Sequence, residues 1–197
     1  MFLFMAVNLK IKHRVNTIEQ LLATESKLGV EIDLRPYSDQ IILNHEPFES
    51  GVNIKDFLAH YRHAFIILNT KSEGMEMHLL KMMEAQGIDN FFFLDLSLPY
   101  LVKTIKLGCK KVAVRFSEYE PLEFVSKFEG KAEWVWIDCF TKNILSENAY
   151  KYLSRHFKTC IVSPELQGHP LSWIDDFKSA FAHFKLDAVC TKHPELW

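Results

Sequence analysis

The chain has 197 residues, of which 48% are hydrophobic and 24% are charged. This is the composition of one globular domain, and it excludes a disordered, collagen-like or membrane-embedded chain. The formal net charge is −2 and the basic residues are scattered, so we expect no basic surface for a nucleic-acid backbone or an anionic membrane. We therefore expect a single domain over residues 1–197, with no nucleic-acid partner and no membrane insertion.

The cysteines and the first residues bear on location. Cys109, Cys139, Cys160 and Cys190 form no CxxC pair, which excludes a zinc ribbon and a dense disulfide framework and favours a reducing cytoplasm. The apolar residues 1–7 lack a basic segment and a small-residue cleavage site, and they are too short to span a bilayer. We expect them to lead into the first buried strand.

Short apolar runs without helical periodicity recur along the chain, and each has the length of a buried parallel strand. The eight predicted strands are residues 7–11, 30–34, 65–68, 91–94, 112–116, 134–137, 160–162 and 188–190.

Helical patterns lie between these runs. Thr17 with Gln20 forms a capping box, after which Ile18, Leu21 and Leu22 fall on one predicted helix face. The same apolar spacing recurs within residues 98–105 and within residues 173–184, just before the last strand.

Alternating strands and helices predict a parallel sheet covered by helices, and eight such units predict a (β/α)8 TIM barrel. The usual barrel has about 250 residues, so this one is compact. Residues 191–197 are only a tail, so the barrel lacks a full closing helix. A doubly wound open sheet is the alternative.

The second predicted strand carries acidic residues on one face. Side chains alternate along a strand, so Glu31, Asp33 and Arg35 share one face, opposite the apolar side chains. Two carboxylates buried together need a compensating positive charge, and a divalent cation bound by oxygen is a common solution. The alternative is that Arg35 neutralises one acid while water solvates the other at the strand end.

Other polar residues follow the predicted strands. His13-Arg14 ends the first, and Asn69 and Lys71 follow the third, so all are expected at the carboxyl face where barrel enzymes hold their sites. Residues 36–51 form a long connection with an extended piece at Gln40–Leu43, followed by His45. His45 is either an ordinary surface histidine or, with His13, half of an acid–base pair.

In this order, these residues resemble the glycerophosphodiester phosphodiesterase family, within the phospholipase C-like phosphodiesterase barrels. The resemblance rests on His13-Arg14, on Asn16-Thr17 opening a helix, on residues 29–33 with Glu31 and Asp33, and on residues 39–47 with His45. Residues 186–194 are similar to the closing strand of that family. The resemblance spans nearly the whole chain and is most specific in its first fifty residues.

The resemblance implies a (β/α)8 barrel that binds one divalent cation, Mg or Ca, and hydrolyses a phosphodiester with two histidines. His13 and His45 match the acid–base pair, and Arg14 matches the phosphate-contacting arginine. Glu31 and Asp33 match two metal ligands, and Asn69 stands where the family has the third carboxylate. An amide oxygen can coordinate a hard cation, but the exchange removes a formal charge and should weaken binding.

The chain also departs from the family elsewhere. Val15 follows His-Arg where the family has Gly, and the connection to Asn-Thr is shorter and lacks the family's Glu. Glu46 replaces the Asp after the active-site histidine, and Lys192 replaces the Asp of the late Thr-Asp.

Polar residues at later strand ends are candidates to shape a substrate pocket. One of them, Arg115, could bind a second anionic group. The alternative for each is an ordinary loop or helix-capping residue, which is the more common role. The others are Asp95, Asp138 and Ser163. The run of phenylalanines at residues 91–93 and the pair Trp134 and Trp136 are best interpreted as core.

The sequence therefore predicts a metal-dependent phosphoric diester hydrolase. Arg14 and Lys71 would neutralise the phosphate, His45 would serve as acid and His13 as base, or the reverse, and the attacking hydroxyl belongs to water or to the substrate. The absence of a hydrophobic docking ridge favours a small polar diester. The alternatives are a degenerate barrel that binds a phosphorylated metabolite without turnover, and a sugar-phosphate isomerase or aldolase in which Lys71 is a base or Schiff-base former.

Overall fold

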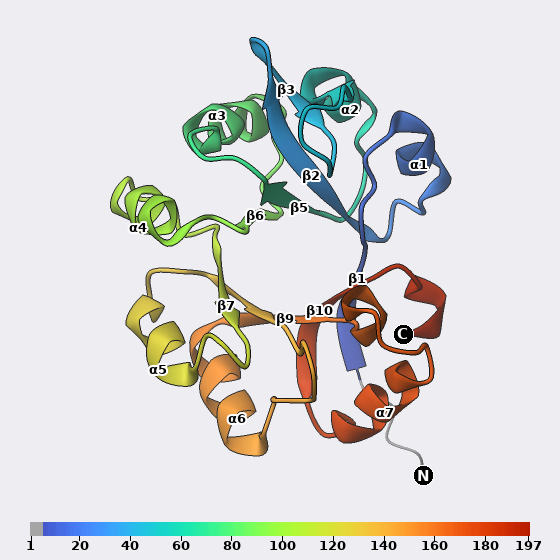
Figure 1. The fold of residues 1–197 in the computed structure, drawn as a ribbon, viewed down its shortest axis with the longest axis vertical. Helices are drawn as coiled ribbons and strands as arrows, with labels where there is room; N and C mark the ends of the chain where they lie inside the picture. Colours follow the sequence, from blue (N-terminus) through green and yellow to red (C-terminus); the bar gives the residue numbers. More distant parts are fainter. Residues whose placement is uncertain (1–5) are drawn as a thin grey trace. The chain divides into compact units, whose positions relative to one another are not determined.

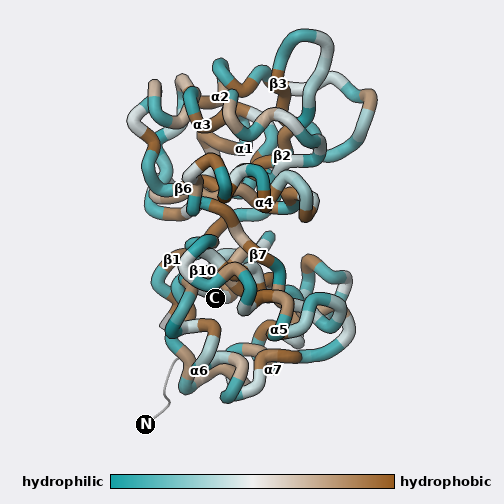
Figure 2. The backbone as a smooth tube through the Cα atoms, turned by 90° about the vertical axis from the view of Figure 1, so that its left-hand side faces the viewer, coloured by the Kyte–Doolittle hydropathy of each residue, from teal (hydrophilic) through white to brown (hydrophobic). Residues whose placement is uncertain are grey.

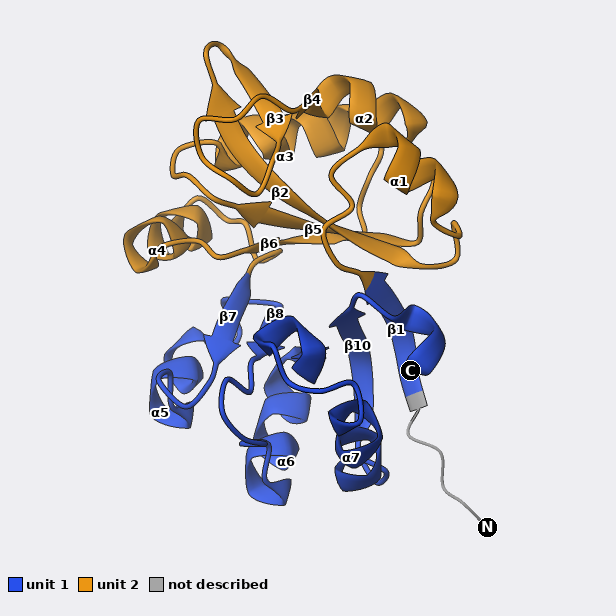
Figure 3. Cartoon of the chain, turned by 45° about the vertical axis from the view of Figure 1, so that its right-hand side comes forward, with its two compact units in different colours: residues 1–11, 113–197 blue, residues 12–112 orange. Residues whose placement is uncertain are grey.

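The computed structural model describes residues 6–197, so most of the predicted lead-in at residues 1–7 lies outside the described residues. The chain folds as two compact units (Figure 3). Unit 1 comprises Met1–Ile11 and Ala113–Trp197, and unit 2 comprises Lys12–Val112.

Unit 2 is built on a mixed sheet with the strand order β4-β3-β2-β5-β6 (Figure 1). Strands β2, β5 and β6 are parallel, whereas β3 and β4 continue from β2 as an antiparallel meander. Its strands are β2 (Gly29–Tyr37), β3 (Gln40–Leu43), β4 (Val52–Asn53), β5 (Phe65–Thr70) and β6 (Phe91–Leu94). Its helices are α1 (Ile18–Ala23), α2 (Ile54–His60), α3 (Glu76–Ala85) and α4 (Leu98–Lys106).

Helix α1 begins with the predicted capping box. The Thr17 hydroxyl accepts from the Gln20 backbone N–H, and the Gln20 side chain accepts from the Thr17 backbone N–H. The predicted apolar face of this helix is wrong at Leu22, which is 67% exposed, whereas Leu21 is fully buried. Successive residues of a helix are rotated by about 100°, so in this short helix Leu22 points away when Leu21 faces the sheet.

The strands of unit 1 have the order β1-β10-β9-β8-β7. Strands β7 to β10 pair in parallel. The strands are β1 (Ala6–Lys12, whose last residue belongs to unit 2), β7 (Ala113–Phe116), β8 (Trp134–Ile137), β9 (Lys158–Val162) and β10 (Lys185–Thr191). The helices are α5 (Leu122–Val125), α6 (Glu147–His156) and α7 (Trp173–Ala180), with short 3-10 helices η1 (Ser126–Phe128), η2 (Pro164–Gln167) and η3 (Pro194–Leu196).

Both units contain fully buried strands, which is typical of parallel sheets covered by helices. Every residue of β5, β6 and β8 is buried, which confirms the core assignment of the phenylalanine run and of Trp134 and Trp136. In Figure 2 the brown colour of hydrophobic residues is visible along β3 and β7. No helix in residues 6–197 is long and apolar enough to cross a membrane.

All eight predicted strands are present, as β1, β2, β5 and β6 to β10, which confirms the α/β class. The extended piece Gln40–Leu43 is β3, while β4 was not predicted because it has only two residues. Helix α7 ends at Ala180, so the pattern over residues 173–184 overran it. The residues after β10 form only η3, in line with the predicted lack of a full closing helix.

Candidate active site

Strand β2 brings two acids into the interior of unit 2. Glu31 and Asp33 are both 0% exposed, and they lie on one strand face because side chains alternate. In the parallel pairing of β2 with β5, Asp33 is in register with Asn69. The segment after β1 runs alongside, because the Val15 N–H donates to the Glu31 carbonyl oxygen at 2.8 Å.

Glu31 is surrounded by hydrogen-bond donors. Its Oε2 accepts from the backbone N–H of Arg14 and its Oε1 from Nδ2 of Asn69, both at 2.8 Å. His13 Nε2 lies 3.7 Å from Oε2. Burial, followed by the negative charge of Asp33, raises the pKa of Glu31 to about 7 although these two hydrogen bonds oppose the shift.

Asp33 has a different set of neighbours. Asn16 donates to its Oδ2 and accepts from its backbone N–H, both at 2.9 Å, while Lys71 Nζ and His45 Nδ1 each lie 3.3 Å from its Oδ1. Burial would raise the pKa of Asp33, but the Asn16 hydrogen bond and the positive charge of Lys71 outweigh it and hold this pKa below its usual value. Asp33 is therefore ionised at neutral pH.

His45 is held from both sides of its ring and through its backbone. Its Nδ1 faces Asp33, and its Nε2 lies 2.8 Å from Nη2 of Arg14. A guanidinium only donates, so Nε2 accepts here and the ring proton lies on Nδ1, toward Asp33. Arg35 fixes the backbone by donating from Nε and Nη2 to the His45 carbonyl oxygen, at 3.0 and 2.8 Å.

The loop that carries His45, residues 44–51, is closed at its base. Asn44 Nδ2 donates to the Ser50 carbonyl oxygen at 2.8 Å. Gly51 packs against the backbone of Leu43 so closely that a Cβ there would overlap the Leu43 carbonyl oxygen. Only glycine fits at this position, so the β3–β4 connection itself sets the place of His45.

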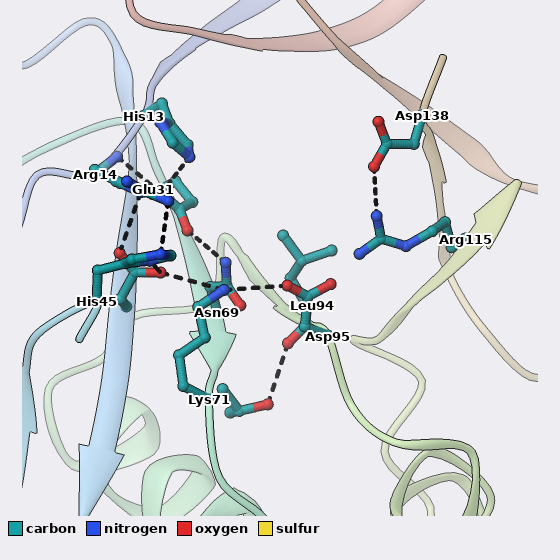
Figure 4. Close-up of polar contacts among 12 residues, drawn as sticks. His13, Arg14, Glu31, His45, Asn69, Lys71, Leu94, Asp95, Arg115 and Asp138 are labelled. Carbon is teal, nitrogen blue, oxygen red and sulfur yellow. Dashed lines mark hydrogen bonds and ion pairs between the residues drawn. The ribbon is translucent and has the colours of Figure 1, made fainter. Parts of the chain in front are cut away.

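Two cationic side chains border the carboxylates (Figure 4). Arg14 has a φ of 55°, in the left-handed region, and its Nε lies 3.8 Å from Asp33 Oδ2. Lys71 Nζ lies between Asp33 Oδ1 at 3.3 Å and Asp95 Oδ2 at 3.2 Å. Asp95 also has a left-handed φ, 59°. Left-handed backbone in non-glycine residues is strained, and such strain gathers at functional sites.

The donor atoms fit a hard cation in part. Two buried carboxylates adjoin Asn69, whose Oδ1 is buried and has no hydrogen-bond partner within residues 6–197. An amide oxygen and carboxylates are ligands that Mg²⁺ and Ca²⁺ accept. The described residues contain no group of three or more His, Cys, Asp or Glu side chains placed to hold a metal ion. The fitting set is therefore Glu31, Asp33 and Asn69, with one carboxylate fewer than the resemblance implies.

Unit 2 contains the predicted site residues except Arg115, Asp138 and Ser163, which belong to unit 1. Arg115 forms ion pairs there with Asp138 and, at 3.8 Å, with Glu120. Its role toward a substrate stays a prediction.

The role of Asn16 was not predicted, and the alternative in which Arg35 neutralises one of the two acids is wrong. Arg35 does not neutralise Glu31 or Asp33, because it donates instead to the carbonyl oxygens of His45 and Lys71. Asn16 was noted only as part of Asn-Thr, although an amide just before a capping box is well placed to bond an adjacent strand.

No protein-family model matches the sequence, and no curated protein matches it. Solved structures do. A glycerophosphodiester phosphodiesterase from Agrobacterium tumefaciens has a TM-score of 0.68 at 12% identity, with 96% of this chain and 99% of that one covered. A second Agrobacterium tumefaciens structure, a putative glycerophosphoryl diester phosphodiesterase, has a TM-score of 0.67 at 12% identity over 97% and 96%.

A third match comes from Parabacteroides distasonis. This glycerophosphoryl diester phosphodiesterase has a TM-score of 0.68 at 11% identity, over 98% of this chain and 87% of that one. The resemblance found in the sequence is thus confirmed for the fold, over almost the whole chain. Identities of 11–12% mark this chain as divergent from these structures.

Proposed function

We propose that the protein hydrolyses a small phosphodiester with the help of one divalent cation, Mg or Ca. The observation that carries this proposal is the pairing of each histidine with one buried carboxylate of β2, His45 with Asp33 and His13 with Glu31, beside Arg14. The fold likeness to glycerophosphodiester phosphodiesterases supports the same reaction class. A cytoplasmic location and the absence of nucleic-acid partners belong to this proposal.

We further propose that the eight strands β1, β2 and β5 to β10 close one (β/α)8 barrel, so that residues 1–197 form a single domain. The support is the parallel pairing within each unit and the coverage of nearly complete phosphodiesterase chains. Strands β3 and β4 would then be an insertion that carries His45.

In this proposal a cation would be held by Glu31, Asp33 and Asn69, and when bound it would polarise a non-bridging phosphate oxygen. Arg14 and Lys71 neutralise the remaining phosphate charge, which grows in the transition state. His13 removes the proton from the attacking hydroxyl, of water or of the substrate itself. His45, which takes a proton from solvent at Nε2 once the phosphate has drawn Arg14 away, donates that proton to the departing alkoxide, and His13 returns its proton to solvent after the products leave.

The neighbours of His45 suit the acid role. Asp33 faces Nδ1 and keeps the ring in one orientation while the positive charge of the imidazolium is present. Arg14 now donates to Nε2, and a bound phosphate would take over that guanidinium N–H and leave Nε2 to face the leaving oxygen.

A barrel that binds a phosphorylated metabolite without turnover is the second candidate. It is favoured by Asn69, which donates its amide to Glu31 where a third carboxylate would bind metal. A Schiff-base enzyme is disfavoured, because the Lys71 amine is engaged by Asp33 and Asp95.

Release of glycerol phosphate from glycerophosphodiesters tests the proposal. We expect turnover with Mg²⁺ or Ca²⁺ and its loss after chelation. Calorimetry without substrate should show binding of one of these ions at millimolar concentration. Binding of a phosphorylated metabolite without hydrolysis under any metal condition would support the second candidate.

A further inference from the structure

Glu31, Asp33 and the side chains that contact them form a carboxylate cluster. Beside this cluster, unit 2 has a pocket of about 540 Å³ that has no part in the proposed proton transfers. We propose that this pocket binds the alcohol that leaves the phosphodiester, and that this alcohol is an uncharged polyol. The inference rests on the proposed hydrolysis and deepens it by naming the class of leaving group. The polar side chains that line the pocket are those of Arg14, Asn16, Thr17, Gln20, Asn44 and Ser50.

The position of the pocket links it to the leaving group. Arg14 lines the pocket and also contacts Nε2 of His45 at 2.8 Å. Asn44 and Ser50, at the two ends of the His45 loop, form part of its wall. Because His45 is the proposed proton donor to the leaving oxygen, the alcohol attached to that oxygen must lie on the side of His45, and this pocket is lined by Arg14 and by residues of the His45 loop.

The charge of the lining decides the kind of alcohol. Arg14 is the only ionisable side chain among the lining residues, and no carboxylate accompanies it. A quaternary or primary ammonium group would therefore lie near a guanidinium, with no carboxylate among the lining residues to attract it. Amide and hydroxyl side chains both donate and accept hydrogen bonds, and so do the hydroxyls of a polyol. Leu43 and Val52 add aliphatic contacts for its carbon chain.

Gln20 and Ser50 retain hydrogen-bonding groups for a ligand. Gln20 Oε1 accepts from the backbone N–H groups of Asn16 and Thr17, at 2.8 and 3.1 Å. These bonds fix the side chain, while its Nε2 makes no hydrogen bond within the part of the chain that the structure describes. The Ser50 hydroxyl likewise has none there, although its carbonyl oxygen is bonded to Asn44. The pocket thus offers a pre-positioned amide donor and a hydroxyl.

A second pocket in unit 2 would suit a cationic leaving alcohol instead of an uncharged one. It has a volume of about 230 Å³ and is lined by Glu73, Glu76 and Asp95 around Lys71. Its acidic lining would suit a cationic alcohol instead. A choline-type leaving group would therefore be expected on the Lys71 side of the cluster, not on the Arg14 side.

The Gln20→Glu variant tests the inference. Glutamate at this position preserves the capping box, but it replaces the amide donor of the pocket with a carboxylate. We would measure kcat/KM for glycerophosphoinositol and glycerophosphocholine. The wild type should prefer the inositol diester, and Gln20→Glu should lower the inositol-to-choline ratio by about 10-fold or more, the scale for leaving a substrate hydroxyl without its partner.

Gln86→Glu is the matched control, because Gln86 is exposed at the end of α3 and does not line the pocket. It should leave the ratio unchanged. A wild-type preference for the choline diester, equal use of both diesters, or an equal loss of both in Gln20→Glu overturns the inference.

A binding readout separates failure of the inference from failure of the proposed hydrolysis. If the wild type cleaves neither diester, the hydrolysis proposal fails. Titration with inositol 1-phosphate should still shift the side-chain amide NMR signals of Gln20, and phosphocholine should not. Unchanged Gln20 signals with inositol 1-phosphate overturn the pocket assignment whether or not the protein is an enzyme.

Discussion

Glu31 and Asp33 lie two residues apart on β2 and are both fully buried, yet the pKa of Glu31 is raised to about 7 while that of Asp33 lies below its usual value. The neighbours explain the difference. The Asn16 hydrogen bond, followed by Lys71 and His45, stabilises the charged form of Asp33, whereas the hydrogen-bond donors at Glu31 do not overcome its burial. Pairs of acids with separated pKa values are typical of sites that move protons.

At the residue scale, His45→Ala should lower turnover by about 10²–10⁴-fold without loss of folding, the usual effect of removing a positioned proton donor. His13→Ala should have an effect on the same scale. The measurement is kcat on a glycerophosphodiester, with circular dichroism to verify folding. His78→Ala, at an exposed position of α3, is the control and should retain wild-type turnover. Full activity of the His45→Ala variant would contradict the proposal that His45 is the proton donor.

Asn69→Glu distinguishes a working metal site from a lost one. The change removes the amide donor to Glu31 and adds a third carboxylate, so without metal the like charges should lower the melting temperature. With Mg²⁺ or Ca²⁺ the added ligand should tighten binding by about 1 kcal/mol or more. Melting curves with the ion and with chelator measure both effects.

Asn69→Gln keeps an amide and serves as the control for side-chain length. If Asn69→Glu is destabilised to the same degree with and without metal, the cluster does not bind a cation, and the non-catalytic barrel is favoured.

At the element scale, a carboxylate in unit 1 connects the segments that follow β7 and β8. Glu118 accepts from the backbone N–H groups of Phe140, Thr141 and Lys142, at 2.7–3.2 Å, and from the Thr141 hydroxyl. Burial alone would raise the pKa of Glu118, but these hydrogen bonds outweigh it and lower the pKa to about 2. The ionised side chain thereby holds two loops in one arrangement.

The pH dependence of stability follows from that shift. Because the pKa in the folded state is below the ordinary 4.5, the stabilisation is complete above about pH 4.5 and is lost as the pH falls toward 2. Glu118→Gln should cost on the order of 1 kcal/mol at pH 7 after allowance for solvent screening, and much less near pH 2. Denaturant unfolding at both pH values measures this.

Glu123→Gln, at an exposed position in α5, removes the same charge from the same unit and should change stability less. An equal loss for Glu118→Gln at pH 2 and pH 7 would contradict the role of the ionised carboxylate.

At the scale of the whole molecule, the prediction concerns the two units. If they close one barrel, neither has a complete sheet alone, and heating should unfold the chain in a single cooperative transition whose calorimetric and van't Hoff enthalpies agree. Differential scanning calorimetry measures both enthalpies. Two separate transitions would contradict the single domain.

The fold likeness at 11–12% identity also shows why the function must be argued from the site. A fold persists while the pattern of buried apolar residues persists, and that pattern tolerates extensive substitution. Activity depends on few atoms, and one fold can host many chemistries. Asn69 is one residue, yet its amide changes both the charge and the ligand set beside Glu31.

The sequence by itself determined the α/β class, the eight strands and the α1 capping box, because apolar periodicity and capping are local along the chain. It also selected His13, Arg14, Glu31 and Asp33 as candidates through their spacing and the family resemblance. The sequence did not predict the exposure of Leu22 or the end of α7, because only packing decides which residues of a short helix are buried.

Only the tertiary structure decided how the candidates meet. Strand register places Asn69 opposite Asp33, from where its side-chain amide reaches Glu31, and the β3–β4 hairpin returns His45 to Asp33 and Arg14. The bonds of Asn16 to Asp33 and of Arg35 to the His45 carbonyl oxygen also join residues distant in sequence. Such contacts depend on where two separate backbone segments lie after folding, and no local pattern of residue types contains that information.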